Sequence, residues 1–155
     1  ERFLPHYQET GLFATTPVPG MVELTRSLHA KGYRLGIASC KPWIYCGPTL
    51  QHCGFSDCFE AIAGSWHNGV PEEKTAVIRE ALRLLDVPAG QAVMIGDRGV
   101  DISCAASLGI PGIGLSYCGY GEPGELEQAG AVAVAPTAEA LGRIIEEQAW
   151  DHSDK

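Results

Sequence analysis

Residues 93–101 read VMIGDRGVD: a short apolar run leads through a glycine to two aspartates that stand four positions apart. Two like charges at this spacing face each other across one helical turn, which costs roughly a few tenths of a kcal/mol unless a positive charge lies between them. One interpretation is a cation held by both carboxylates. The other is a pair of solvated acids at a helix N-terminus, where negative side chains are favoured. The spacing alone leaves both interpretations open.

Around this stretch, short apolar segments alternate with amphipathic ones. The pattern predicts strands at residues 33–39, 60–65, 92–96, 110–117 and 131–135, and helices at residues 21–32, 43–53, 71–86, 100–109, 124–130 and 137–150. Thr137 is expected to cap the last helix. The apolar face of helix 71–86 comprises Ala76, Val77, Ala81, Leu84 and Leu85. This alternation predicts an α/β fold, with a mostly parallel sheet covered by helices on both faces.

Composition and charge exclude several classes of partner. The chain of 155 residues is 45% hydrophobic and 19% charged, which is ordinary for a globular domain. Its net charge of −8 argues against a nucleic acid or a membrane surface, because both require a basic face. A small phosphorylated metabolite needs only a local positive pocket. No apolar run approaches the ~18 residues of a membrane-spanning helix. The six cysteines form no C-x-x-C pair, so we expect reduced thiols in a cytoplasmic protein.

Ligands of parallel sheets bind beyond the carboxyl ends of the strands, which here are residues 39–41, 64–65 and 96–97. Ser39, with backbone N–H groups at a helix start, could form an anion-binding corner, or it could cap the helix that begins near Trp43. Lys74 stands in the first turn of a helix, where the helix dipole disfavours a cation. A functional role and simple solvation are both open for this lysine.

Asp97 ends its strand beyond a glycine, and its carboxylate is expected to point into the cleft at that edge of the sheet. Asp101, in the first turn of the next helix, is expected to face the same way. Mg²⁺ prefers such hard oxygen ligands and commonly takes one or two carboxylates, with water and substrate completing its shell. Asp97 and Asp101 are therefore candidate magnesium ligands.

A second motif invites a different function. The run GYGEPG at residues 119–124 matches the G-x-G-x-x-G pattern of dinucleotide-binding loops. Pro123 and the short helix that follows weaken the match, and the ordinary interpretation is a glycine-rich surface loop. The phosphate-binding pattern G-x-x-x-x-G-K and the zinc pattern H-E-x-x-H are both absent from the sequence.

Three motifs follow one another in a familiar order: LGIASCKP at residues 35–42, Lys74 within PEEKTAVI, and the long run MIGDRGVDISCAASLGIPGIGLSYCGYGEPGEL at residues 94–126. In this order they resemble the motifs of the haloacid dehalogenase-like phosphohydrolases, and within these the phosphoglycolate phosphatase group. The resemblance covers nearly the whole chain. It implies a Rossmann-like three-layer fold and a magnesium-dependent phosphatase.

The resemblance also implies roles for individual residues. Ser39, with the backbone of Cys40 beside it, matches the position that holds the transferring phosphoryl group. Lys74 matches the lysine that neutralises phosphate charge and steadies the nucleophile. Asp97 matches the Mg²⁺ ligand, and Asp101 matches its partner acid, which supports the metal directly or through water.

One departure from the family pattern is large. The family nucleophile is the first aspartate of a D-x-D-G-T segment on the central strand, and no D-x-D occurs in this sequence. We expect residues 1–17 to be the remnant of a helical cap, residues 18–150 to be an incomplete core without its central strand, and residues 151–155 to be a frayed tail. The missing segment would belong to the same chain or to a separate one, and the 155-residue chain alone is predicted to be inactive. The alternative is a non-catalytic module that binds phosphate or metal and has lost its nucleophile.

Overall fold

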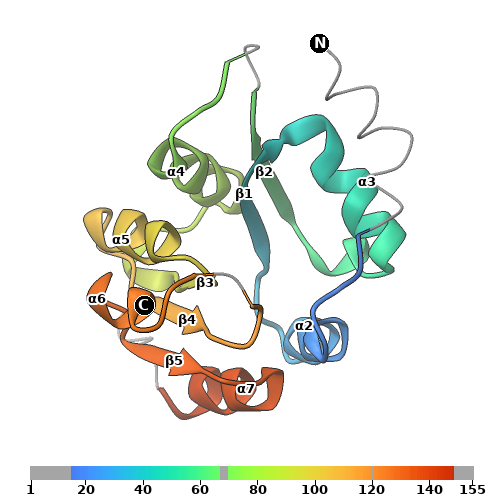
Figure 1. Cartoon of the computed structure of the whole chain (residues 1–155). Helices are drawn as coiled ribbons and strands as arrows, with labels where there is room; N and C mark the ends of the chain where they lie inside the picture. The colour runs from blue at the N-terminus through green and yellow to red at the C-terminus, as the bar shows by residue number, and fades with distance from the viewer. Residues whose placement is uncertain (1–14, 67–69, 120, 149–155) are drawn as a thin grey trace. The chain divides into compact units, whose positions relative to one another are not determined.

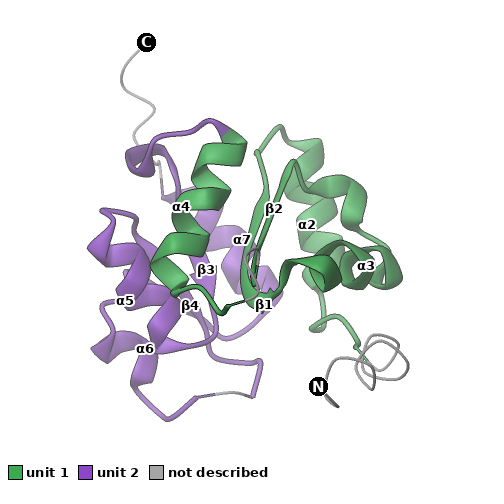
Figure 2. Ribbon diagram, turned by 90° about the horizontal axis from the view of Figure 1, so that it is seen from above, with its two compact units in different colours: residues 1–85 green, residues 86–155 purple. Residues whose placement is uncertain are grey.

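The computed structural model describes residues 15–66, 70–119 and 121–148. It divides into two compact units, residues 1–85 and residues 86–155, which Figure 2 colours separately. Each unit contains parallel strands with helices packed against them, and each is described by itself below. No helix within the described ranges combines the length and the apolar character needed to cross a membrane.

The first unit contains a two-stranded parallel sheet. Its elements in chain order are α2 (Met21–Ala30), β1 (Gly36–Pro42), α3 (Trp43–Cys53), β2 (Ala61–Ser65) and α4 (Lys74–Leu85). The two strands start in register, with Gly36 opposite Ala61, and the register shifts after Ala38 so that Pro42 pairs with Ser65. Helices α3 and α4 both contact the two strands and lie on opposite sides of them (Figure 1). This arrangement places the turn after each strand at one end of the unit.

The core of this unit forms where α4 packs on the sheet. Ala63 of β2 is fully buried and is packed with Val77 and Ala81 of α4. The predicted apolar face of α4 was only partly right, because Leu84 is 43% exposed and Ile78 is buried instead. Ile78 follows Val77 directly and shares with it a wide buried face of the helix.

The second unit contains a three-stranded parallel sheet in the order β3-β4-β5. Its elements are β3 (Met94–Gly96), α5 (Gly99–Ser107), β4 (Gly112–Leu115), α6 (Glu125–Gln128), β5 (Ala133–Ala135) and α7 (Ala138–Glu147). Helix α5 contacts β3 and β4, and α7 contacts β5. The predicted cap of α7 is present, because the Thr137 hydroxyl oxygen accepts a hydrogen bond of 3.1 Å from the Ala140 backbone N–H.

The predicted order of helices and strands is confirmed, and two boundaries that matter for the site differ. Strand β1 runs to Pro42 rather than ending at Ser39, because pairing with β2 resumes after the register shift. Helix α4 begins at Lys74 rather than at residue 71, since the Glu72 N–H is bonded to the Ser65 hydroxyl outside the helix. The predicted cap remnant lies mostly outside the described residues, as does the predicted frayed tail, and the predicted domain boundaries stay a prediction.

Gly64 of β2 lies in close contact with α3. A Cβ atom added to Gly64 would stand 2.5 Å from the Trp43 Cα and 2.8 Å from its backbone nitrogen, and a backbone cannot turn aside as a flexible side chain can. We expect Gly64→Ala to lower the free energy of unfolding by about 1–3 kcal/mol, as overpacking commonly does. Urea denaturation followed by circular dichroism measures the change.

A matched control is Gly47→Ala within α3, where nothing lies within 4 Å of the added Cβ and where alanine is the better helix former. Gly47→Ala should leave stability unchanged or slightly raised. Equal stability of the two variants would contradict the close contact between β2 and α3.

Candidate active site

Ser39 is the middle residue of β1 and is half-buried. Its hydroxyl oxygen accepts a hydrogen bond of 3.1 Å from the Lys41 backbone N–H, so the side chain folds over its own turn. Helix α3 has Pro42 at its N-cap and no side-chain cap. Of the two interpretations from the sequence, the helix cap is therefore wrong. The Ser39 hydroxyl therefore accepts from Lys41 and is also hydrogen-bonded with the Cys46 thiol.

The cysteines near this turn have different environments. Cys40 is exposed, whereas Cys46 of α3 is buried and its sulfur lies 3.7 Å from the carbonyl oxygens of Lys41 and Pro42. Burial raises the pKa of the Cys46 thiol, and the Lys41 charge and a hydrogen bond with Ser39 offset this only in part. Cys46 is thus held as a neutral thiol that supports the turn, since a thiol must ionise to act as a nucleophile.

Lys74 is the first residue of α4, and its half-buried ammonium lies at the end of β1. Its Nζ donates a hydrogen bond of 2.6 Å to the carbonyl oxygen of Ala38, a residue 36 positions earlier in the chain. Ala38 directly precedes Ser39. The packing of α4 on the sheet therefore brings Lys74 to the residue before Ser39, and the roles of the two side chains in phosphate binding stay predictions.

A second serine fixes the approach to Lys74. Ser65 ends β2, is 1% exposed, and accepts a hydrogen bond of 2.6 Å from the Glu72 N–H. This bond ties the strand end to the turn from which α4 starts. The sequence located residues 64–65 at a strand end but gave them no role; the structure gives Ser65 a positioning one.

A hollow of about 300 Å³ elsewhere in this unit is lined by Gly64, Glu72, Ala76, Val77 and Glu80. It contains neither Ser39 nor Lys74, and its two carboxylates would repel a phosphate group. We therefore place the candidate phosphate site at the end of β1 and not in this hollow.

Asp97 and Asp101 lie together at the carboxyl end of β3. The Asp101 carboxylate accepts a hydrogen bond of 3.3 Å from the Arg98 backbone N–H, and the Asp101 N–H donates one of 3.0 Å to the Arg98 carbonyl oxygen. A Cβ added to Gly96 would lie 2.7 Å from an Asp101 carboxylate oxygen, so that carboxylate rests on the backbone just before Asp97. Asp101 is 9% exposed and Asp97 is half-buried. Asp101 therefore caps α5, as one of the two sequence interpretations expected, and its role as a metal ligand stays a prediction.

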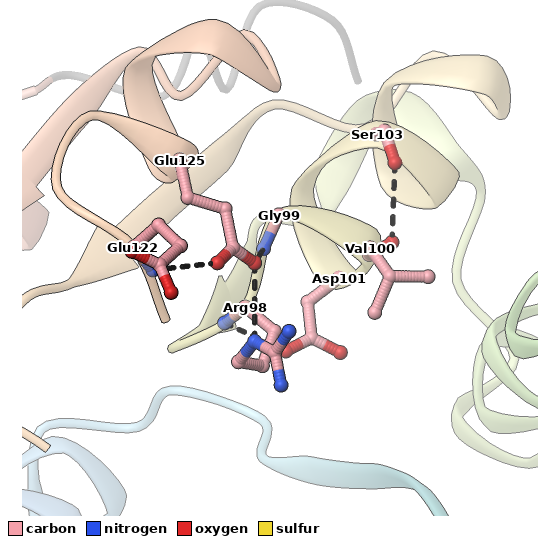
Figure 3. A network of polar contacts seen from close by, with 7 residues as sticks. All are labelled: Arg98, Gly99, Val100, Asp101, Ser103, Glu122 and Glu125. Carbon is pink, nitrogen blue, oxygen red and sulfur yellow. Dashed lines mark hydrogen bonds and ion pairs between the residues drawn. The ribbon is translucent and has the colours of Figure 1, made fainter. Parts of the chain in front are cut away.

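Two residues that the sequence analysis did not single out complete this strand end (Figure 3). Glu125, at the start of α6, accepts hydrogen bonds from the Gly99 N–H at 2.6 Å, the Glu122 N–H at 3.0 Å and the Arg98 Nε at 3.1 Å. The Arg98 pKa is raised, first by the bond and ionic attraction to Glu125 and further by the charges of Asp97 and Asp101. The Gly99 N–H contributes most to lowering the Glu125 pKa to about 2, followed by Glu122 and Arg98. The sequence did contain a sign of this cluster, because Arg98 stands between Asp97 and Asp101 and therefore had to find a carboxylate partner nearby.

Asp97 also lines a hollow of about 220 Å³ together with Ser116, Val134 and residues 121–127. The GYGEPG run forms part of its wall, with Tyr120 outside the described residues. Helix α6 after this run spans only Glu125–Gln128. The four-residue helix is too short for a dinucleotide fold unit, and its first side chain already occupies the nearby N–H groups. The ordinary interpretation, a glycine-rich surface loop, agrees with the exposure of residues 121–124.

The carboxylate oxygens of Asp97 and Asp101 are donor atoms of the kind that Mg²⁺ binds. Asp97 and Asp101 supply hard oxygen donors from one strand end, as that ion requires. Within the described residues no group of three or more His, Cys, Asp or Glu side chains is placed to hold a metal. Two carboxylates are nonetheless sufficient when water and substrate supply the remaining oxygens.

Comparison with known proteins identifies the family. A family model for haloacid dehalogenase-like hydrolases matches residues 3–109. A phosphoglycolate phosphatase from Cupriavidus necator is 32% identical over 92% of this chain and 62% of its own length. A 5'-nucleotidase from Pseudomonas aeruginosa is also 32% identical, over 91% of this chain and 65% of its own length. The chain belongs to the haloacid dehalogenase-like hydrolases.

A solved structure supports the same assignment. The crystal structure of a protein from Clostridium acetobutylicum, described as a predicted phosphatase, superposes with a TM-score of 0.86 at 33% identity. The match covers 92% of this chain and 66% of the other. The predicted α/β fold class and family are thereby confirmed. The chain spans less than two thirds of the length of each of these three proteins.

The low pKa of Glu125 predicts an acid-sensitive contribution to stability. Its ordinary value of 4.5 is lowered to about 2 in the folded chain, so the folded state favours the ionised form. This contribution is present above pH 4.5 and is lost as the pH falls toward 2. We expect Glu125→Gln to unfold in urea with a weaker dependence on pH across that interval than the unaltered chain. Identical pH dependence in both proteins would contradict the three-bond environment of the carboxylate.

Proposed function

We propose that the protein to which this chain belongs is a magnesium-dependent phosphomonoesterase of the phosphoglycolate phosphatase type. The observation that best supports the proposal is the 2.6 Å hydrogen bond from the Lys74 ammonium to the carbonyl oxygen of Ala38, the residue before Ser39. A hydroxyl donor and a fixed ammonium at one strand end suit a phosphoryl group. Asp97 and Asp101, in the second unit, are proposed separately as the residues that hold Mg²⁺.

In the proposed mechanism, each residue stabilises the transferring phosphoryl group. The Ser39 hydroxyl donates to one of its oxygens. The charge of the Lys74 ammonium offsets the negative charge that spreads over the equatorial oxygens. Asp97, supported by Asp101, would hold Mg²⁺, which supplies further charge neutralisation when bound.

The attacking group in this proposal lies outside the chain. An aspartate of an additional segment would attack phosphorus, the leaving alcohol would depart with a proton, and water would hydrolyse the aspartyl-phosphate. Support comes from the absence of D-x-D from the sequence. It also comes from the strand pairing: within the described residues β1 pairs only with β2, and β3 only with β4. The same segment would supply backbone partners for such strand edges.

The substrate is proposed only as a class. The similar proteins named above are a phosphoglycolate phosphatase and a 5'-nucleotidase, so a small phosphorylated metabolite fits both. The competing proposal is a non-catalytic module that binds phosphate or metal. The absence of a D-x-D motif is the observation that favours it.

The test is hydrolysis of p-nitrophenyl phosphate in the presence of Mg²⁺. We expect no turnover by the 155-residue chain and turnover by a protein extended to include the upstream coding region. In the extended protein, Lys74→Met should lower kcat by roughly 10²–10³-fold, the range for loss of one charge-stabilising group. Lys31→Met, at an exposed lysine just after α2, is the matched control and should retain full activity.

Two results would contradict the proposal. Turnover by the 155-residue chain that is lost in Asp97→Asn would refute the external nucleophile. An upstream region without D-x-D, joined to a protein that binds Mg²⁺ but hydrolyses nothing, would favour the non-catalytic module.

A further inference from the structure

We propose that Cys46 is a positioning residue that holds the Ser39 hydroxyl in place for a phosphate group. The inference rests on the phosphate-binding role proposed above for Ser39 and names the side chain that orients it. Both residues belong to the first unit, where Cys46 lies in α3 and Ser39 in β1. Cys46 lies outside the three motifs found in the sequence.

The Cys46 thiol is closed in by three parts of this unit. Cys46 is 3% exposed and lies in the first part of α3. Its sulfur is 3.7 Å from the carbonyl oxygens of Lys41 and Pro42, at the end of β1. On the side of β2, a Cβ added to Gly64 would lie 2.9 Å from this sulfur. The thiol therefore lies between the two strand ends and the helix that follows β1, where it has little freedom to move.

The direction of each hydrogen bond around the thiol follows from its partners. Carbonyl oxygens can only accept, so the single S–H proton of Cys46 is directed at the carbonyl oxygens of Lys41 and Pro42. The side-chain hydrogen bond between Ser39 and Cys46 then has the Ser39 O–H as its donor and the sulfur as its acceptor. The Ser39 oxygen in turn accepts from the Lys41 N–H at 3.1 Å. Both the oxygen and the proton of this hydroxyl are thus held.

A sulfur atom suits this role because it is a weak acceptor. A phosphate oxygen carries charge, and hydrogen bonds to charged acceptors are roughly twice as strong as those between neutral groups. An incoming phosphate can therefore take over the Ser39 proton from Cys46 while the Lys41 N–H still holds the Ser39 oxygen. Ser39 then needs only a rotation of its O–H and no change of side-chain rotamer.

The competing interpretation of Cys46 is simple packing, because a buried neutral thiol commonly behaves as a small apolar side chain. The same unit offers a cysteine for comparison. Cys58 is 2% exposed and lies in the short helix η2 (Ser56–Cys58), before the start of β2. It matches Cys46 in burial and lies at the other end of β2 from Gly64, so it serves as a control for the loss of a buried thiol.

The experiment is a double-variant cycle in the protein extended to include the upstream coding region, with kcat/KM for p-nitrophenyl phosphate as the readout. We expect Ser39→Ala to lower kcat/KM by roughly 10–100-fold, as loss of a hydrogen bond to a charged group does. Cys46→Ala should lower it by roughly three- to tenfold, in line with loss of a hydrogen bond between neutral groups. Cys46→Ala added to Ser39→Ala should cause no further loss, because the thiol then has no hydroxyl to orient.

Two further variants separate this role from packing. Cys46→Ser retains a group that donates to the two carbonyls and accepts from Ser39, and it should keep roughly half or more of the unaltered kcat/KM. Cys58→Ala leaves a cavity at an equally buried position, so it should lower the free energy of unfolding but leave kcat/KM within about twofold of the unaltered value. Thermal unfolding checks that each variant is folded.

The outcomes separate this inference from the proposed function. An extended protein without turnover, or with kcat/KM unchanged in Ser39→Ala, would contradict the proposed role of Ser39 and the inference with it. A large loss in Ser39→Ala with none in Cys46→Ala would overturn only the role of Cys46. Losses that multiply in the double variant, or a Cys46→Ser protein as weak as Cys46→Ala, would show that Cys46 acts through packing alone, and this too would overturn the inference.

Discussion

Backbone N–H groups beyond the strand ends need hydrogen-bond partners, and the side chains that satisfy them form the site. The Lys41 N–H is bonded to Ser39, the Glu72 N–H to Ser65, the Arg98 N–H to Asp101 and the Gly99 N–H to Glu125. Unpaired polar groups of the backbone are costly when buried, so each turn depends on a nearby oxygen. The same four oxygens shape the places where phosphate and metal are proposed to bind. The proposed function would therefore rest on bonds that also stabilise the fold.

The two units position their cationic side chains, Lys74 and Arg98, in different ways. In the first unit, the cation belongs to a helix that packs on the sheet: Lys74 is the first residue of α4, and its ammonium donates a hydrogen bond to the carbonyl oxygen of Ala38. In the second unit, a cation is already present in the turn, and Glu125 on α6 restrains it. A fixed positive side chain strengthens the binding of a phosphate group. A positive side chain near a cation weakens the binding of that cation unless another residue neutralises it.

Features that follow from the periodicity of the sequence were predicted correctly, whereas features that depend on tertiary contacts were missed. The alternation of strands and helices and the α7 cap at Thr137 were readable from periodicity and capping preference. The extension of β1 to Pro42 was not, because it depends on a register shift against β2. Glu125 lies within the family run at residues 94–126, but its contacts with Arg98 and Gly99 were missed because these partners lie in a different turn. The exposure of Leu84 was missed because helical spacing gives the direction of a side chain but not the extent of the surface that covers it.

The ion pair between Arg98 and Glu125 has a consequence for inheritance. The two residues are 27 positions apart, and the bond between them joins the turn after β3 to the start of α6. Loss of the arginine would leave the Glu125 carboxylate with two of its three donors, and loss of the glutamate would leave the Gly99 and Glu122 N–H groups without this acceptor. Substitutions at the two positions are therefore expected to be linked.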